Sequence, residues 1–527
     1  MSNASISGMP RAPTPPGQAP LAVLARAMAG VEVVREAPGW TLLRVDAGGL
    51  EALAHRLASQ QRLRLADLFA APGDGPGQVV LRLVFGAEAD HRFVVVESPV
   101  DGDRYAPLSD VAPAAYVEEC EIFELFGVRP ASGKPLNRVL MPPQAERTFP
   151  LLGGHRTVMP QEVRAPHVIQ GEAFELPFGP VRAAAWESLY MGLVTTGEEI
   201  LDLYLFQFHK HRGVERRLAG LTPERALFLV ERTEGLSAVA NAVSFCRAVE
   251  QACGAAVPAA AACTRALALE LERLYNHAAA IAALCQTTGL AVGQAAVEIA
   301  LERLLRLNAA VFGHRYLFGV VGLGGARRGP DGEALSRELG PALSELRRAL
   351  DGLLATNSFL DRLEATGTVA PETARRLGLV GPVGRASGVD LDLRRDHPEP
   401  PYDQLPVTVP VREAGDALAR LEIMAAELDE SERLIRALPP EAGAAAAPEV
   451  TADPAGGSAL GWAESARGET LAWVTLGKDG RIQRARLRPA AVRNWRAFDD
   501  AVRAQNVFTD VPIIEASFWL TVAGFAR

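Results

Sequence analysis

Apolar positions recur every second residue near the start of the chain. This spacing, typical of half-buried β-strands, is clearest at residues 40–45, 79–85 and 92–98. A helical stretch is predicted near residues 50–68, and the apolar period changes from two to about 3.6 across residues 112–126. We therefore expect a small α+β domain at residues 21–145.

A second pattern begins after a break rich in proline and glycine. Strand-like runs at residues 181–194 and 198–208, on both sides of Thr195-Thr196-Gly197, predict a β-hairpin. Pro223 in a first helical turn after Thr222 as N-cap then opens a long helical region. Helices are expected at residues 223–229, 237–253, 259–287, 294–318, 332–354 and 414–438. Strands return at residues 470–476 and 481–487, and the apolar segment 508–527 is expected to pack into the core.

The predicted fold class is α+β, with the small N-terminal α+β domain followed by a mainly helical large domain with peripheral β-hairpins at residues 171–527. Residues 1–20 are rich in Pro, Ser and Gly and lack an apolar core, which predicts a disordered tail rather than a secretion signal. Residues 146–170 form a connector. The Ala-, Gly- and Pro-rich stretch at residues 441–458 predicts a flexible insert.

Composition narrows the classes of function. The formal net charge of −9 does not indicate the positively charged surface that binds nucleic acid. No apolar run approaches the ~20 residues that cross a bilayer, so we expect membrane contact only through partners. The five cysteines include no ligand pair, the closest being Cys246 and Cys253, so we expect no metal centre on this chain. Their odd number favours a reducing compartment.

Residues 116–128 read Tyr-Val-Glu-Glu-Cys-Glu-Ile-Phe-Glu-Leu-Phe-Gly-Val. This acidic helix, its Glu-Leu-Phe-Gly turn and the basic loop that follows resemble the signature of the 30 kDa subunit of respiratory complex I. The four glutamates, Glu118, Glu119, Glu121 and Glu124, form either a solvated helix face or a docking face.

The larger region is similar to the 49 kDa subunit of complex I and to the large subunit of NiFe hydrogenases. The fused order resembles group 4 membrane-bound hydrogenases of the formate hydrogenlyase and hydrogenase-4 type. The resemblance rests on an ordered series of motifs: residues 178–182, 197–199, 208–215, 270–277, 384–392, 401–402, 467–469 and 479–482.

Departures from the family's metal motifs limit the chemistry. In the first motif, Glu234 and Ser237 replace two nickel-binding thiolates and Asn241 replaces a histidine. In the second, Thr521 and Gly524 replace the other two thiolates. A carboxylate, two hydroxyls and a glycine cannot hold a Ni–Fe centre, so hydrogen turnover is the least favoured function.

In complex I the corresponding cavity binds quinone, which makes Arg182 and Glu234 the candidate quinone contacts here. Arg182 replaces the family's histidine and could hydrogen-bond a carbonyl, but could not donate a proton near neutral pH. Glu234 either carries protons or belongs to a buried ion network. The candidate partners of Glu234 in that network are Arg232, Arg212 and Arg273.

Other motif residues have structural interpretations. His209 and His211 are expected to make structural hydrogen bonds. Glu272, Arg273 and His277, which share one predicted helix, are expected to bind neighbouring backbone and subunits.

The resemblance implies a peripheral-arm large subunit of a complex I-like or energy-converting-hydrogenase-related oxidoreductase. Such a subunit lies in the cytoplasm against the inner face of the membrane. It docks a small iron–sulfur subunit carrying 4Fe–4S clusters and rests on membrane anchor and antiporter-like subunits. Any link to NAD would come through a partner. The rival interpretation is a non-catalytic scaffold or coupling subunit.

Overall fold

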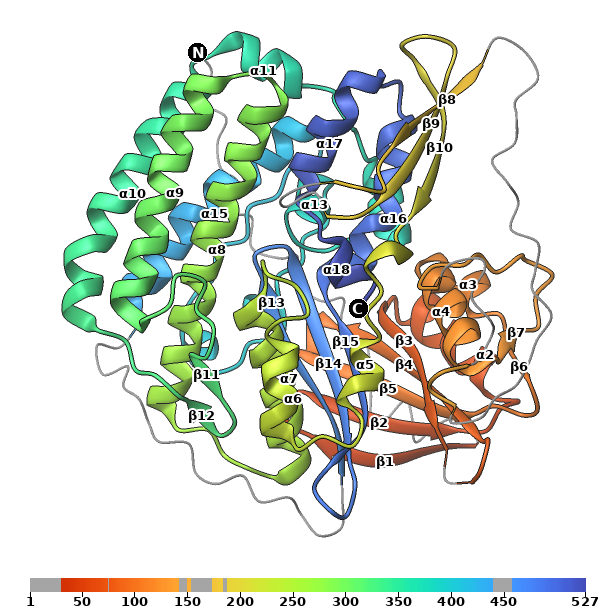
Figure 1. Ribbon diagram of the computed structural model, residues 1–527. Coiled ribbons are helices and arrows are strands. Elements are labelled where there is room, and N and C mark those ends of the chain that lie inside the picture. Colours follow the sequence, from red (N-terminus) through yellow and green to blue (C-terminus); the bar gives the residue numbers. More distant parts are fainter. Residues whose placement is uncertain (1–29, 74, 142–148, 153–172, 183–186, 439–456) are drawn as a thin grey trace.

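The computed structural model describes residues 30–73, 75–141, 149–152, 173–182, 187–438 and 457–527 (Figure 1). The predicted tail at residues 1–20, nearly all of the predicted connector, and residues 441–456 of the predicted insert lie outside the described residues.

A five-stranded sheet forms the N-terminal unit, in the order β1-β2-β5-β4-β3. Strands β2 and β5 run parallel and the other neighbours antiparallel. Alternate side chains of β5 enter two different apolar cores: Phe93 and Val95 face the large unit, and Val94 and Val96 enter the second core. The elements of this unit are β1 Val31–Ala37, β2 Trp40–Val45, α2 Leu50–His55, β3 Arg64–Pro72, β4 Val79–Ala87, β5 Arg92–Pro99, β6 Arg104–Tyr105, α3 Leu108–Val111, α4 Tyr116–Phe126 and β7 Arg129–Pro130.

The helix predicted near residues 50–68 is too long. The helical stretch, α2 with a π-helical turn after it, ends at Gln60, and β3 begins at Arg64. β3 pairs with β4 along its whole length and is buried at almost every position. Its Leu- and Ala-rich sequence favours a helix locally, so the strand is imposed by sheet pairing.

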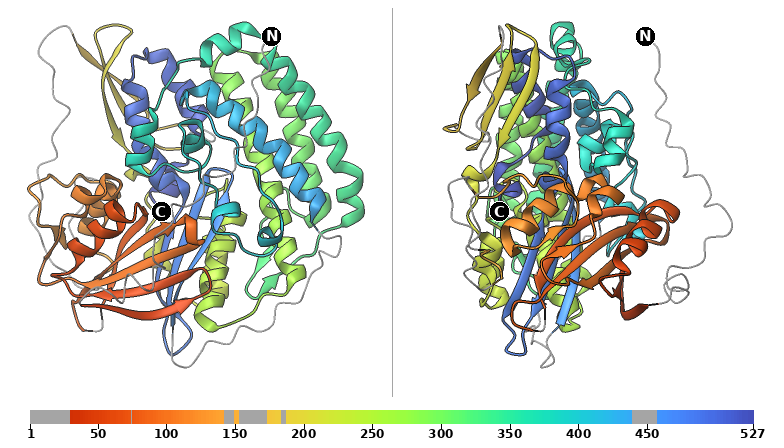
Figure 2. Two further views of the ribbon diagram at one scale, coloured as in Figure 1. Left: turned by 180° about the vertical axis from the view of Figure 1, so that it is seen from behind. Right: turned by 90° about the vertical axis from the view of Figure 1, so that its right-hand side faces the viewer.

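Long helices build the large unit. α8 (Ala259–Thr287), α9 (Ala291–Phe312), α10 (Gly332–Leu354) and α15 (Ala417–Ala437) lie side by side in both views of the bundle (Figures 1 and 2). The predicted bounds of α8 and α10 are confirmed. The predicted continuation of α9 to residue 318 is wrong, because Gly313 ends the helix in a left-handed conformation.

A three-stranded sheet, β13-β14-β15, lies at the centre of the molecule, with α7 (Ala238–Cys253) packed against it (Figure 1). β14 (Gly468–Leu476) and β15 (Ile482–Arg488) match two predicted strands. β13 (Gly457–Ser465) was not predicted, and it includes Gly457 and Ser458, which the sequence assigned to the flexible insert. A Cβ on Gly461 would overlap the backbone of α7, so the close packing of α7 on β13 requires a small residue there. Because small residues lack the apolar alternation of a strand, the sequence carries no signal for β13.

A second three-stranded sheet, β10-β9-β8, lies next to α16, on the side of the molecule away from α9 and α10 (Figure 1). β9 (Tyr190–Thr195) and β10 (Ile200–Phe206) form the predicted hairpin, although β9 begins well after residue 181, and β8 (Phe174–Phe178) adds a third strand. The final apolar segment is mostly buried, as predicted. Within the described ranges, no helix is both long and apolar enough to span a membrane.

The remaining elements connect these layers. They are α5 Val214–Leu218, α6 Pro223–Val230, β11 Val321–Gly322, β12 Gly325–Ala326, α11 Asn357–Leu363, α12 Pro371–Leu377, α13 Gly381–Ala386, α14 Leu393–Asp396, α16 Ala490–Arg503, α17 Val511–Phe518 and α18 Val522–Phe525.

Candidate functional site

Glu234 lies in the loop between α6 and α7 and is only 2% exposed. Its Oε2 accepts a hydrogen bond from the hydroxyl of Thr521, which is the N-cap of α18. The same hydroxyl accepts a hydrogen bond from the backbone N–H of Gly524. The structure therefore brings together Glu234, Thr521 and Gly524, three of the site residues predicted from the sequence.

Arg467 provides the positive charge of the Glu234 cluster, which consists of Glu234, Ser237, Arg467, Thr521 and Gly524. Its Nη2 lies 2.7 Å from Glu234 Oε1, and it also donates to the hydroxyl of Ser237, the N-cap of α7. Arg467 occupies the turn between β13 and β14. The next residue, Gly468, has φ 117° and lies so close to the backbone of Gly381 that a side chain would not fit. This close approach fixes the turn that carries Arg467.

The partners that the sequence suggested for Glu234 are wrong. Arg212 donates to the backbone carbonyl of Thr233, Arg232 pairs with Glu231, and Arg273 belongs to a separate ion network. Arg467 was missed, although it opens the Arg-Gly-Glu motif that carried part of the resemblance. The motif itself was therefore the signal that could have found it.

Gly524 explains how a glutamate fits at position 234. A Cβ built on Gly524 would overlap both Glu234 Oε2 and the Thr521 hydroxyl. The glycine therefore leaves the space that the carboxylate fills. Together Glu234, Thr521 and Arg467 occupy the centre of the cluster with direct contacts, and each is at most 4% exposed.

Asn241 and Arg182 are placed differently from these residues. Asn241 lies on the first turn of α7, where its backbone N–H donates to the carbonyl of Ser237. Its side-chain Nδ2 is buried and has no hydrogen-bond partner in the described part of the chain. Arg182 instead pairs with Glu515 of α17 at 2.6 Å. Burial raises the pKa of Glu515, and the positive charge of Arg182 opposes that shift.

A titratable carboxyl adjoins the cluster. Glu272 of α8 is buried and accepts hydrogen bonds from the backbone N–H groups of Val239 and Ala240, at 2.8 and 3.1 Å. Burial raises its pKa to about 8, while Arg467 lowers it and Glu234 raises it further. The site thus holds a carboxyl that changes protonation near neutral pH.

The predicted structural role of the α8 motif is confirmed for its contacts within this chain. Glu272 binds the start of α7, and Arg273 donates to the carbonyls of Glu464 and Ser465 at the end of β13. His277 Nε2 lies 2.9 Å from Glu427 of α15, which also pairs with Arg385. These contacts join the bundle to the central sheet.

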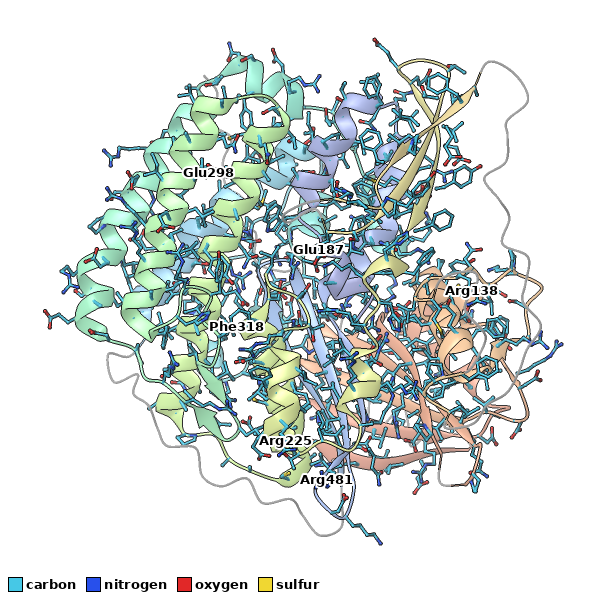
Figure 3. The ribbon with its side chains drawn as sticks, viewed as in Figure 1. Arg138, Glu187, Arg225, Glu298, Phe318 and Arg481 are labelled. Carbon is cyan, nitrogen blue, oxygen red and sulfur yellow. The ribbon has the colours of Figure 1, made fainter. Side chains whose placement is uncertain are left out.

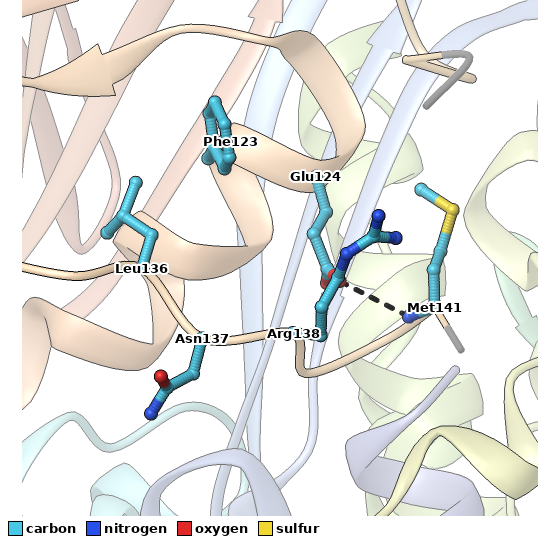
Figure 4. A pocket seen from close by; sticks show the side chains of 6 residues that line it. All are labelled: Phe123, Glu124, Leu136, Asn137, Arg138 and Met141. Atoms are coloured by element: carbon cyan, nitrogen blue, oxygen red, sulfur yellow. Dashed lines mark hydrogen bonds between the residues drawn. The ribbon is translucent and has the colours of Figure 1, made fainter. Parts of the chain in front are cut away.

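The acidic helix α4 was expected to present either a solvated or a docking face. The solvated interpretation is wrong, because all four glutamates are buried. Glu118 pairs with Arg493 at 3.0 Å and Glu121 with Arg486 at 2.6 Å, so the helix docks within the chain. Glu124 accepts from the backbone N–H of Met141 in the loop that follows α4 (Figure 4).

No group of three or more His, Cys, Asp or Glu residues that could hold a metal ion occurs among the described residues. His211 is half-buried and burial lowers its pKa, whereas His209 is exposed. A further carboxylate, Glu187, points toward the start of α18, where it accepts from the backbone N–H of Ala523 at 2.7 Å (Figure 3).

Two family descriptions match this chain. Residues 43–156 match the 30 kDa subunit of the respiratory-chain NADH dehydrogenase, and residues 299–442 match its 49 kDa subunit. A solved archaeal complex, the membrane-bound sulfane sulfur reductase, contains a similar chain with a TM-score of 0.61 and 23% identity. The alignment covers 68% of this chain and all of the archaeal chain, and the likeness shows that the two chains share a fold.

Curated relatives agree with these matches. Formate hydrogenlyase subunit 5 of Escherichia coli is 28% identical over 81% of this chain and 78% of its own length. Hydrogenase-4 component G of the same organism is 27% identical over 81% and 77%. A chain of the NADH-quinone oxidoreductase of Salinispora arenicola is 34% identical over 48% of this chain and 67% of its own length. The protein therefore belongs to the complex I and hydrogenase-related family of the respiratory-chain NADH dehydrogenase 30 and 49 kDa subunits, with both units in one polypeptide.

Proposed function

We propose that this chain is a peripheral subunit of a membrane-bound, complex I-like oxidoreductase, in which it docks an iron–sulfur protein and performs no nickel chemistry. The observation that carries the proposal is the buried Glu234–Arg467 ion pair. The motif resemblance aligns Glu234 with one of the family's metal ligands. The relatives support a place in a multi-subunit oxidoreductase, because they are named as parts of formate hydrogenlyase, of hydrogenase-4 and of an NADH-quinone oxidoreductase. The solved complex with a similar chain is named as membrane-bound.

The residues at this position do not fit a Ni–Fe centre. Glu234 is already bound by Thr521 and Arg467, and Ser237 is bound by Arg467. Bridging metals need thiolates, and a guanidinium at hydrogen-bond distance repels a metal cation. The cluster instead replaces a charged metal site with a buried ion pair.

An exposed aromatic patch adjoins the site and fits the docking role. Phe228 and Tyr316 are 56% and 41% exposed, and the guanidinium of Arg232 lies 3.7 Å from the ring centroid of Phe228. Aromatic residues and arginine are enriched at protein interfaces. Because Arg232 is two residues before Glu234, a partner protein docked on this patch would cover the loop that carries the cluster.

Purification of the affinity-tagged full chain from membranes of its source organism tests the proposal. We expect an iron–sulfur protein and integral membrane proteins to elute with the chain, with iron but no stoichiometric nickel in the complex. Recovery of the chain alone under mild detergent, or of one nickel per chain, would contradict the proposal.

A second candidate function, quinone binding at the cluster, has one specific observation in its favour. Four buried donor atoms at this site, namely Asn241 Nδ2, Thr233 Oγ1 and the Nε and Nη1 of Arg467, have no hydrogen-bond partner among the described residues. Such donors suit a carbonyl ligand. However, Glu234, Ser237, Asn241 and Thr521 are each at most 3% exposed, so a quinone could reach them only if the site opens.

The variant Asn241→Leu separates quinone binding from a purely scaffolding role. It removes the unpartnered donor at similar volume and leaves the Glu234–Arg467 pair intact. If quinone binds here, the intact complex loses quinone-linked turnover while its subunit composition is unchanged. If the subunit is a scaffold, turnover and composition both remain at the wild-type level.

A further inference from the structure

A cavity of about 240 Å³ lies outside the Glu234 cluster, at a junction of three segments. Its walls come from α7 and α8, from the turn that precedes β2, and from residues 399–402. Cavities that hold drug-sized ligands usually exceed about 300 Å³, so this one suits a smaller molecule.

Part of the cavity's polar wall is already satisfied within the chain. The Arg265 guanidinium donates to both carboxylate oxygens of Glu250, and Glu250 also accepts from the backbone N–H of Gly324. The hydroxyl of Tyr402 donates to Glu270 at 2.6 Å. These groups shape the wall but are occupied by one another.

Two other residues retain donors. Arg247 uses Nη1 for the carbonyl of Trp462, at 2.6 Å, and Nη2 for Glu399, at 2.5 Å. Its Nε has no hydrogen-bond partner within the described chain. Gln251 accepts from Trp40 Nε1 through its oxygen, so its side-chain N–H groups are left without a described partner. Arg247 and Gln251 are one helical turn apart on α7 and line the same cavity.

The charged side chains in the cavity wall determine which ligand charge the cavity favours. Arg247 and Arg265 balance Glu250 and Glu399, so the cavity is neutral before a ligand enters. Burial and the neighbouring charge of Arg265 lower the pKa of Arg247 to about 9, although Arg247 is paired with Glu399. One additional negative charge would stabilise Arg247, whereas a dianion such as phosphate would meet the repulsion of both carboxylates.

The rest of the wall is apolar, with Val243, Val257, Ala262 and Leu269 from α7, α8 and their connection. We infer that this cavity binds a small monocarboxylate with an apolar body, its carboxylate held by Arg247 and Gln251 and its body packed against these aliphatic side chains. The site is separate from the Glu234 cluster, and the inference does not depend on the proposed function.

Calorimetric titration of the purified full chain with benzoate tests this inference. We expect saturable binding of benzoate, with benzamide and inorganic phosphate each binding at least about tenfold more weakly, because a charge-assisted hydrogen bond contributes roughly 1.5–3 kcal/mol. No saturable heat with benzoate, or equal affinity for benzamide, would overturn the monocarboxylate assignment. Tighter binding of phosphate would overturn it as well.

Two variants locate the binding site. Arg247→Met removes the guanidinium, and Ala262→Trp fills the cavity from a half-buried position while residue 247 stays an arginine. Both should abolish benzoate binding, while Arg348→Met on the exposed face of α10 should bind like the wild type. If Arg247→Met fails to fold, Ala262→Trp alone tests whether benzoate binds in this cavity. Wild-type affinity of Ala262→Trp for benzoate would exclude the cavity as the site.

Discussion

The guanidinium of Arg467 lies 2.7 Å from the carboxylate of Glu234, with both side chains almost completely buried. Two segments far apart in sequence, the loop before α7 and the turn before β14, are therefore joined by opposite charges at the centre of the molecule. Neither charge has access to solvent that could replace its partner. The stability of the fold should depend strongly on keeping both charges or removing both.

Glu234→Gln should lower the free energy of unfolding by about 3–5 kcal/mol, because it leaves the buried charge of Arg467 without its carboxylate. Chemical denaturation monitored by circular dichroism measures the change. The double variant Glu234→Gln with Arg467→Met removes both charges and should recover much of the loss. Equal stability of the wild type and the single variant would show that the ion pair contributes nothing.

Glu272 should make the protein less stable as the pH rises through neutrality. The folded protein holds the Glu272 proton up to a pKa of about 8, whereas the ordinary value is 4.5. Between these pH values the folded state binds more protons than the unfolded state, so the free energy of unfolding falls by up to about 1.4 kcal/mol per pH unit. The stabilisation by the bound proton is complete below pH 4.5 and lost above pH 8.

Denaturation of Glu272→Gln at a series of pH values from 6 to 8 checks this dependence, because the amide cannot ionise and the fall should be shallower than in the wild type. Glu333→Gln, at an exposed position in the first turn of α10, serves as the matched control and should follow the wild-type slope. Parallel slopes for all three proteins would rule out titration of Glu272 in this range.

Arg486→Met should be among the most destabilising substitutions in the chain. The buried guanidinium contacts Asp67 at 2.8 Å, Glu121 at 2.6 Å and Glu215 at 3.7 Å. Its loss removes the cation of Asp67 and one of the cations beside Glu121 and Glu215, which keep Arg527 and Arg484. We expect a loss of more than about 4 kcal/mol, measured by thermal or chemical unfolding.

Arg481→Met offers a control for Arg486→Met just before the same strand. Arg481 is exposed and its ion pair with Asp479 spans 3.9 Å, so the change in unfolding free energy should stay within about 0.5 kcal/mol. If both variants lost a similar amount of unfolding free energy, the buried ion network would contribute no more to stability than an exposed ion pair.

Phe228→Glu should weaken docking of the iron–sulfur subunit without harming the fold. The ring is more than half exposed, so the substitution should change the stability of the isolated chain by less than about 1 kcal/mol. Quantitative mass spectrometry of the affinity-purified complex should show depletion of the small subunit. Leu354→Glu, on an exposed position at the end of α10, should leave the complex complete. Normal recovery of the small subunit with Phe228→Glu would remove this patch from the interface.

Regular elements with strong local patterns were predictable, and long-range pairings were not. α8 and α10 match their predicted bounds because helical periodicity and end signals are local properties. β3 and β13 were missed because the Leu- and Ala-rich sequence of β3 and the Gly- and Ala-rich sequence of β13 become strands only through their neighbours.

The same contrast between local patterns and long-range contacts holds for the candidate site. Glu234, Ser237, Thr521 and Gly524 could be selected by comparison with the family's motifs, and the structure places them together. Arg467, the partner of Glu234 and Ser237, was missed because charge alone does not distinguish it among the many arginines of this chain, and the Arg-Gly-Glu motif that it opens was not used to select it. Only the turn fixed by Gly468 directs its side chain to Glu234.

The burial of α4 has a consequence for the synthesis of the protein. Glu118 and Glu121 leave the ribosome well before their partners Arg493 and Arg486, which lie hundreds of residues later in the chain. Until then the nascent N-terminal unit carries acidic side chains without their cations, and the sheet face that receives β13–β15 stays uncovered. The nascent chain should therefore bind chaperones that shield this surface, and release from them should require the last strand and α16.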